Sequence, residues 1–137
     1  MMIDTNLNKP LIEKLARKNI LVVDDEGIIT KTLCDLLKKA GFYADASGDG
    51  FDAIEKAEET GFDLIIADIR MPEIDGVQTI RKIRESSRIK NKPDAPVIFI
   101  TGFPDSFAAS EAREFGEVVT KPFDMKEFLS VVEKYIQ

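Results

Sequence analysis

The fold is decided by the stretch Ile20-Leu21-Val22-Val23-Asp24-Asp25, an apolar run that ends in two carboxylates. Three further apolar runs, 64–67, 97–100 and 118–120, are followed by Asp68, Thr101 and Lys121. Continuous apolar runs are expected for parallel strands that helices cover on both faces of a sheet. The carboxyl ends of such strands share one edge of the sheet, so we expect the five polar side chains to emerge together there.

Helical periodicity fills the segments between these runs. Ile29, Leu33, Leu36, Leu37 and Ala40 follow the spacing of a helix with one buried stripe, and Gly41 stands where that helix should end. Further helices are expected at about 50–60, 77–83, 108–115 and 125–136, and 42–46 is a weaker strand candidate. The last helix should be capped by Asp124 and have Met125, Phe128, Leu129, Val132 and Ile136 on its buried face. Five strand–helix units predict an α/β fold, a doubly wound (βα)5 sandwich whose ligand lies where the strand order reverses.

Composition limits the possible functions. The 137 residues are 44% hydrophobic and 32% charged, enough for one domain with a sizeable core. A net charge of −6 argues against nucleic acid as a direct partner, and the lack of histidine excludes histidine-based metal sites and catalysis on this chain. Cys34 is alone, and no segment resembles a signal peptide or a membrane span. We therefore expect a cytoplasmic protein without membrane insertion.

Residues 1–18 precede the first predicted strand, and we expect them to form an N-terminal extension to a domain at 19–137. Pro10, Leu11, Ile12 and Leu15 are compatible with a short helix that has proline in its first turn. A loosely packed extension and a specific docking element both remain open.

The side chains at the shared edge indicate a chemistry. Carboxylates alone would repel one another, so Asp24, Asp25 and Asp68 indicate a hard divalent cation such as Mg²⁺. The ammonium of Lys121 and the hydroxyl of Thr101 indicate an anionic partner such as a phosphoryl group. An ionised Asp68 needs no general base and can itself be a nucleophile that forms an aspartyl phosphate. Each residue alone also has a plain structural explanation, as a helix cap, a turn or a strand residue.

Four motifs, in this order, resemble the response-regulator receiver family, the CheY-like phosphoacceptor domains of bacterial two-component signalling. They are Ile20-Leu-Val-Val-Asp-Asp-Glu26, Asp68-Ile-Arg-Met-Pro-Glu-Ile-Asp-Gly76, Val97-Ile-Phe-Ile-Thr-Gly102 and Thr120-Lys-Pro-Phe123, and the resemblance covers 19–137. It implies a flavodoxin-like fold with strand order 2-1-3-4-5. It also implies a regulatory phosphoacceptor rather than an enzyme, with a histidine kinase or phosphotransfer protein as donor and an unknown downstream protein as partner.

The resemblance implies roles for the acidic residues. Asp68 would be the phosphoacceptor in a phosphorelay. Mg²⁺ would be held by Asp25, Asp68 and the backbone carbonyl of Arg70, with Asp24 contributing through water.

The resemblance also implies a phosphoryl-binding group. Lys121 would contact the phosphoryl group, Thr101 would turn toward it after phosphorylation, and Gly102 would leave room beside it. The bond between Lys121 and Pro122 is typically cis in the family. The sequence departs from the family at Val118, because receivers commonly carry Tyr or Phe three residues before the lysine.

In the family, movement of the threonine is usually coupled to movement of that aromatic ring, and this chain has no ring at position 118. We expect Phe103, Phe107 or a shift of the fourth helix to transmit the signal instead. Arg70 and Phe103 each stand two residues after a site residue, Asp68 and Thr101 respectively. A long cation and a large ring there would restrict the hydrolytic water, which predicts a comparatively long-lived phosphoryl group.

Two other functions compete with the phosphoacceptor. A phosphorylation-independent receiver-like interaction module would keep the fold, and only Val118 favours it. A hydrolase of the haloacid-dehalogenase type would need an acid two residues after the nucleophile, where this chain has Arg70. Nucleotide binding is disfavoured because no glycine-rich phosphate loop follows the first strand.

Overall fold

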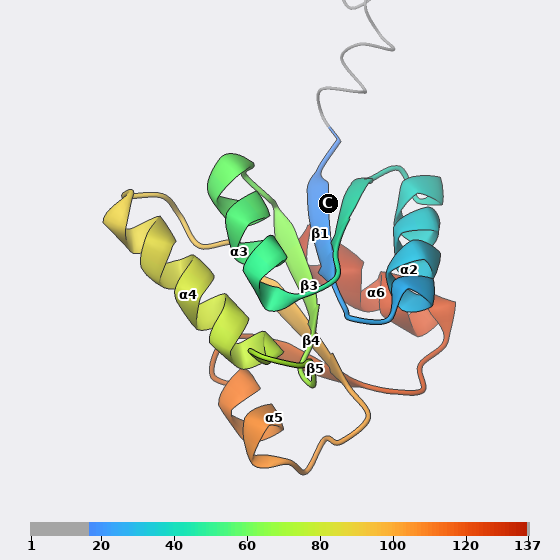
Figure 1. Cartoon of the computed structure of the whole chain (residues 1–137). Coiled ribbons are helices and arrows are strands. Elements are labelled where there is room, and N and C mark those ends of the chain that lie inside the picture. The colour runs from blue at the N-terminus through green and yellow to red at the C-terminus, as the bar shows by residue number, and fades with distance from the viewer. Residues whose placement is uncertain (1–16, 137) are drawn as a thin grey trace, which may run out of the picture.

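Five parallel strands form one sheet in the order β2-β1-β3-β4-β5 in the computed structural model, which describes residues 17–136 (Figure 1). The strands are β1 (Asn19–Val23), β2 (Tyr43–Ser47), β3 (Leu64–Asp68), β4 (Val97–Thr101) and β5 (Glu117–Thr120). The helices are α2 (Gly27–Lys39), α3 (Gly50–Glu59), α4 (Gly76–Ile89), α5 (Phe107–Ala112) and α6 (Met125–Tyr135). The predicted doubly wound order is confirmed.

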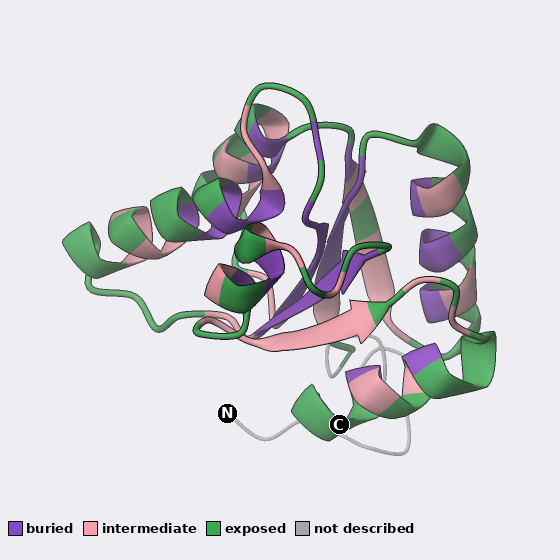
Figure 2. Ribbon diagram, turned by 90° about the horizontal axis from the view of Figure 1, so that it is seen from below, coloured by how far each residue is buried: buried purple, intermediate pink, exposed green. Residues whose placement is uncertain are grey.

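The sheet lies between two layers of helices, with α3, α4 and α5 on one face and α2 and α6 on the other (Figure 1). Alternation along β1 divides its side chains between the layers: Leu21 and Val23 contact the first, whereas Ile20 and Val22 contact the second. The central strands are buried along almost their whole length, and the edge strands β2 and β5 are mostly half-buried (Figure 2). This burial explains the continuous apolar runs of the sequence.

Local sequence sets several helix ends. Asp124 and Glu127 form a capping box at the start of α6, as expected for Asp124, and Asp75 and Gln78 form another at α4. Gly41 follows α2 with a φ of +99°, a conformation that glycine adopts without steric cost.

Three details of the predicted helices are wrong. Ala40 is exposed, because the buried stripe of α2 instead includes Thr30 and Cys34. The α5 helix ends at Ala112, so Phe115 lies beyond it, and Met125 at the start of α6 is 58% exposed. Phe115 still packs against the core, but from the turn that follows the helix.

Most of the predicted extension at 1–18, including its possible short helix, lies outside the described residues. None of the helices at 17–136 is long and apolar enough to cross a membrane.

Candidate functional site

The carboxyl ends of β1 and β3 bring three carboxylates together. Asp24 and Asp25 directly follow β1, and Asp68 is the last residue of β3, its neighbour in the sheet. One oxygen from each carboxylate lies within 4.8 Å of the other two. Asp24 and Asp68 are only 2% and 7% exposed, whereas Asp25 is open to solvent. The shared edge predicted from the sequence therefore holds a compact acidic cluster.

Lys121 enters this cluster from the end of β5. Its Nζ lies 3.4 Å from Oδ1 of Asp68 and 3.6 Å from Oδ2 of Asp24. Its backbone N–H donates to the carbonyl of Thr101 over 2.7 Å, which fixes the loop after β5 against the end of β4. The following bond, between Lys121 and Pro122, is cis.

The acids are held in an unfavourable electrostatic state. Burial, together with the neighbouring Asp24 charge, raises the pKa of Asp68 to about 6, although Lys121 opposes the shift. Burial also raises the pKa of Asp24. The hydrogen bond that its Oδ1 accepts from the Glu26 N–H over 2.9 Å acts in the opposite direction and offsets only part of this rise. One ammonium thus compensates only part of the negative charge. Carboxylates in this arrangement suit a hard divalent cation, and Mg²⁺ is usually bound by one or two of them.

Thr101 lies beside the acids but bonds to its own loop. It is 2% exposed, and its Oγ1 accepts a hydrogen bond from the backbone N–H of Phe103 over 3.0 Å. Gly102, between them, is exposed, and a Cβ there would meet no heavy atom within 4 Å. The Thr101 side chain is therefore tied to the loop that leads into α5.

An open cleft of about 280 Å³ adjoins Thr101, between the loop after β3 and the loop after β4. Ile69, Met71 and Ala108 supply apolar lining. Arg70 and Phe103 also line the cleft, and the guanidinium carbon of Arg70 lies 4.7 Å from the centre of the Phe103 ring. These two residues, expected to flank the site, are in direct cation–π contact with each other.

Val118 occupies the predicted atypical position in β5. It pairs with Phe99 of β4 and packs, half-buried, against the core cluster that contains Ala109 and Ala112 of α5. A valine there fills core space beneath α5 but brings no aromatic ring to the cleft.

Residues 20–133 of this chain match the family model of the response regulator receiver domain. The chain belongs to the response-regulator receiver family. As a receiver domain, it is a regulatory signalling domain of two-component response regulators and not a classical enzyme.

Similar proteins support the assignment of this chain to the receiver family. The chain is 34% identical over 125 residues to the response regulator receiver protein CpdR of Brucella abortus, a match that covers 87% of this chain and 97% of the relative. It is 34% identical over 119 residues to protein PilG of Pseudomonas aeruginosa, covering 85% of this chain and 86% of PilG. Other relatives are longer, and the receiver spans only 23–56% of their lengths.

A solved structure shares the fold of the receiver. The response regulator protein TrrA of Thermotoga maritima, in complex with Mg²⁺ and BeF, superimposes with a TM-score of 0.76 at 32% identity. The superposition covers 87% of this chain and 99% of TrrA.

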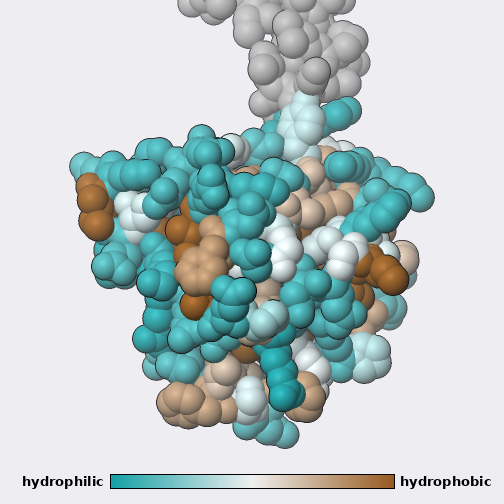
Figure 3. Space-filling view, in the orientation of Figure 1, coloured by the Kyte–Doolittle hydropathy of each residue, from teal (hydrophilic) through white to brown (hydrophobic). Residues whose placement is uncertain are grey.

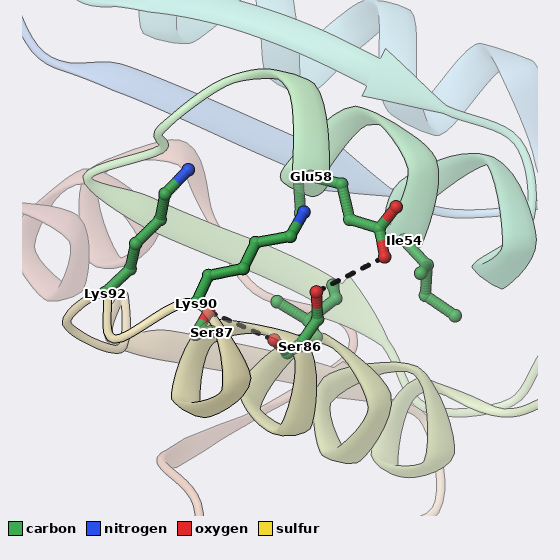
Figure 4. A pocket seen from close by; sticks show the side chains of 8 residues that line it. Ile54, Glu58, Ser86, Ser87, Lys90 and Lys92 are labelled. Carbon is green, nitrogen blue, oxygen red and sulfur yellow. Dashed lines mark hydrogen bonds between the residues drawn. The ribbon is translucent and has the colours of Figure 1, made fainter.

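A second concave region of the receiver lies at the opposite end of the sheet, between the C-terminal turns of α3 and α4 (Figure 4). Ser86 there donates to Glu58 over 3.3 Å, and the side chains of Lys90 and Lys92 rise beside them. Its volume of about 10 Å³ is room for about one water molecule. This region is therefore too small for a ligand larger than a water molecule.

Some features of the receiver site escaped the sequence reasoning. The cleft lining by Ile69, Met71 and Ala108, and the bond between Thr101 and the Phe103 N–H, depend on loop conformations that no residue pattern specifies. The end of this loop could have been predicted from Ser106, a residue type that often caps helices. Ser106 is the N-cap of α5, and its side chain accepts a hydrogen bond from the Ala109 N–H.

Proposed function

We propose that this receiver is a phosphoacceptor switch in a phosphorelay, phosphorylated on Asp68 in a Mg²⁺-dependent reaction. One observation carries the proposal: three carboxylates converge within 4.8 Å while a single ammonium lies 3.4 Å from Asp68. That arrangement combines a nucleophile, oxygen ligands for a cation and a counter-charge for a phosphoryl group. The complex of TrrA with Mg²⁺ and BeF, in a chain 32% identical to this one, supports the same use of the site.

The reaction needs little from the protein beyond position and charge. An ionised Asp68 oxygen forms a bond to the phosphorus atom, while the bond from phosphorus to the donor nitrogen or oxygen breaks and its electron pair leaves with the donor. Lys121 faces the developing negative charge from 3.4 Å. Mg²⁺, held by Asp24, Asp25, Asp68 and the carbonyl of Arg70, would supply the remaining positive charge.

The phosphoryl group then acts through charge. The phosphoryl group carries up to two negative charges where the Asp68 carboxylate carried one, at a buried position. The hydroxyl of Thr101, the last residue of β4, can turn toward it. In the proposed switch, Gly102 leaves room for this rearrangement, which biases the surface between two conformations.

Partners follow from the family and from the charge. Receiver domains interact with histidine kinases and phosphotransfer proteins, and one of these is the proposed phosphodonor. A net charge of −6 supports a protein rather than nucleic acid as the downstream partner. We place the reaction in the cytoplasm, in a domain formed by residues 19–137 with 1–18 as an extension.

Intact-mass measurement tests the proposal. The protein is incubated with acetyl phosphate and Mg²⁺, and the variant Asp68→Asn and a sample with EDTA are treated alike. We expect one phosphoryl adduct on the native chain and none on either control. Failure to form an adduct under any condition would favour the phosphorylation-independent module, with Val118 as the first residue to examine.

A further inference from the structure

We infer that Phe103 is the moving aromatic residue of this receiver: when Asp68 is phosphorylated, its ring leaves Arg70 and enters the cleft beside Thr101. This inference rests on the proposed phosphorylation of Asp68. Position 118 on β5, where an aromatic residue was expected, is valine in this chain. We therefore assign the movement to Phe103 in the loop after β4.

Two contacts hold Phe103 in its present position. Its backbone N–H donates to Oγ1 of Thr101 over 3.0 Å, and its ring lies 4.7 Å from the guanidinium carbon of Arg70. The ring is nevertheless 56% exposed, so little burial opposes a change of position. A large apolar side chain is thus kept at the surface by one hydrogen bond and one cation–π contact.

Both contacts respond to the same new charge. A Thr101 hydroxyl that turns toward a phosphoryl oxygen takes its Oγ1 away from the N–H of Phe103. Arg70 stands two residues after Asp68 and has no ion pair among residues 17–136, so its guanidinium is free to approach the phosphoryl group. Hydrogen bonds between guanidinium and phosphate are stronger than an exposed cation–π contact. One event therefore releases Phe103 from both sides.

The adjacent cleft suits the released ring. Phe103 already lines the cleft, and the apolar side chains of Ile69, Met71 and Ala108 offer contact to a phenyl group. A volume of about 280 Å³ accommodates such a group, and its removal from water favours entry. The pivot at Gly102 is unobstructed, because even an added Cβ would meet no atom within 4 Å.

The movement alters the surface around α5. Phe107 in the first turn of α5 is 80% exposed and does not line the cleft. Figure 3 shows hydrophobic side chains at the lower edge of the molecule, where α5 lies in Figure 1. A downstream protein would meet both rings before phosphorylation and Phe107 alone afterwards, and this difference lets it distinguish the two states.

Fluorescence of a single tryptophan tests the inference, because the chain contains none. The variant Phe103→Trp is titrated with beryllofluoride in the presence of Mg²⁺. We expect its emission to shift to shorter wavelength and its quenching by acrylamide to fall. The matched variant Phe107→Trp, on the exposed first turn of α5, should show neither change. Bound beryllofluoride is followed separately by its ¹⁹F resonance.

The native phenyl ring provides a second measurement, since an indole is larger than the ring it replaces. Methyl resonances of Ile69 and Ala108 should show ring-current shifts on addition of Mg²⁺ and beryllofluoride, and Phe103→Leu should abolish those shifts. The inference would be overturned if beryllofluoride binds while the indole of Phe103→Trp stays exposed and the methyl resonances of the native chain stay unshifted. That result would leave the proposed function intact. Absence of any bound ¹⁹F signal would overturn the proposed function, and this inference with it.

Discussion

At Asp68, the charge state that the proposed reaction needs lowers the stability of the fold. In the proposed reaction its carboxylate must be ionised to attack phosphorus, yet burial and Asp24 raise its pKa from 3.8 to about 6. At neutral pH the fold therefore holds a charge that would be better solvated in the unfolded chain. This cost is the expected mark of a functional group rather than of one retained for stability.

The variant Asp68→Asn should raise the free energy of unfolding at pH 7 by about 1 kcal/mol in the absence of Mg²⁺. The figure is smaller than the pKa displacement alone would give, because solvent at the edge screens the charges and the contact with Lys121 is lost. The folded protein binds the Asp68 proton more tightly than the unfolded chain does. Native stability from this group therefore rises as the pH falls from about 6 toward 3.8, and the Asn variant lacks that rise.

Urea unfolding at several pH values measures this effect. Asp94→Asn is the matched control, because Asp94 is exposed and lies outside the acidic cluster. A lower stability of Asp68→Asn than of the native chain at pH 7 would show that the ion pair with Lys121 outweighs burial and repulsion.

Arg70 and Phe103 should slow the loss of the phosphoryl group. In the phosphorylated state inferred above, Arg70 turns to the phosphoryl group and Phe103 fills the cleft beside Thr101, so both side chains cover this side of the site against water. Replacing both by alanine removes this cover and should speed dephosphorylation about fivefold, the equivalent of about 1 kcal/mol in the barrier.

The decay of the phosphoryl adduct, followed by intact mass after removal of acetyl phosphate, gives the rate. Phe107→Ala is the control, since this exposed ring lies at the start of α5 but outside the cleft. Equal rates in the double variant and the native chain would contradict the shielding role.

The junction between β3 and α4 shows how helix packing positions Asp68. Gly76 begins α4, and a Cβ at this position would lie 2.2 Å from the backbone oxygen of Asp68. The N–H of Gly76 also donates to the carbonyl of Ile69 over 2.8 Å. The helix can approach this closely only where the side chain is a hydrogen atom.

The variant Gly76→Ala should therefore displace the end of β3, lower the free energy of unfolding by about 1–3 kcal/mol and slow phosphorylation. Gly61→Ala is the control, because a Cβ at Gly61 meets nothing within 4 Å. Thermal unfolding and the rate of adduct formation measure the two effects. Normal phosphorylation in the Gly76 variant would mean that the loop adapts without moving Asp68.

The sequence predicted those elements whose signal is local. The apolar runs located the central strands, because strands buried on both faces are apolar along their length. Asp124 located the start of α6, because aspartate is a common N-cap residue. The acidic cluster followed from parallel strands alone. The end of α5 at Ala112 was missed, because Phe115 packs against the core at helical spacing although it lies in the turn after the helix.

The contacts around the cleft could not be predicted from the sequence. Arg84 illustrates the same limit elsewhere in the fold, because it donates to the carbonyl of Phe115 over 3.1 Å and its guanidinium carbon lies 5.3 Å from the centre of that ring. Such contacts join segments about thirty residues apart, and only the assembled layers define them. The contact between Arg70 and Phe103 has the same origin.

From the distribution of charge over the protein, we expect its stability to depend on divalent cations. The chain carries a net charge of −6, and three of its acids meet at one edge with one ammonium between them. A cation that binds only the folded state stabilises it by mass action, by about 2.7 kcal/mol at a hundredfold excess over the dissociation constant. Thermal unfolding should therefore shift upward by several degrees in MgCl₂.

The variant Asp25→Asn separates this binding from general screening. Asp25 is exposed, so its replacement should leave the fold intact while removing a carboxylate from the cluster. We expect most of the Mg²⁺-dependent shift to disappear in this variant and to persist in Asp94→Asn. NaCl at equal ionic strength weakens repulsion over the whole surface and should raise the unfolding temperature of all three proteins alike. A shift in MgCl₂ no larger than in NaCl would mean that the acidic edge does not bind Mg²⁺, because screening alone would account for the stabilisation.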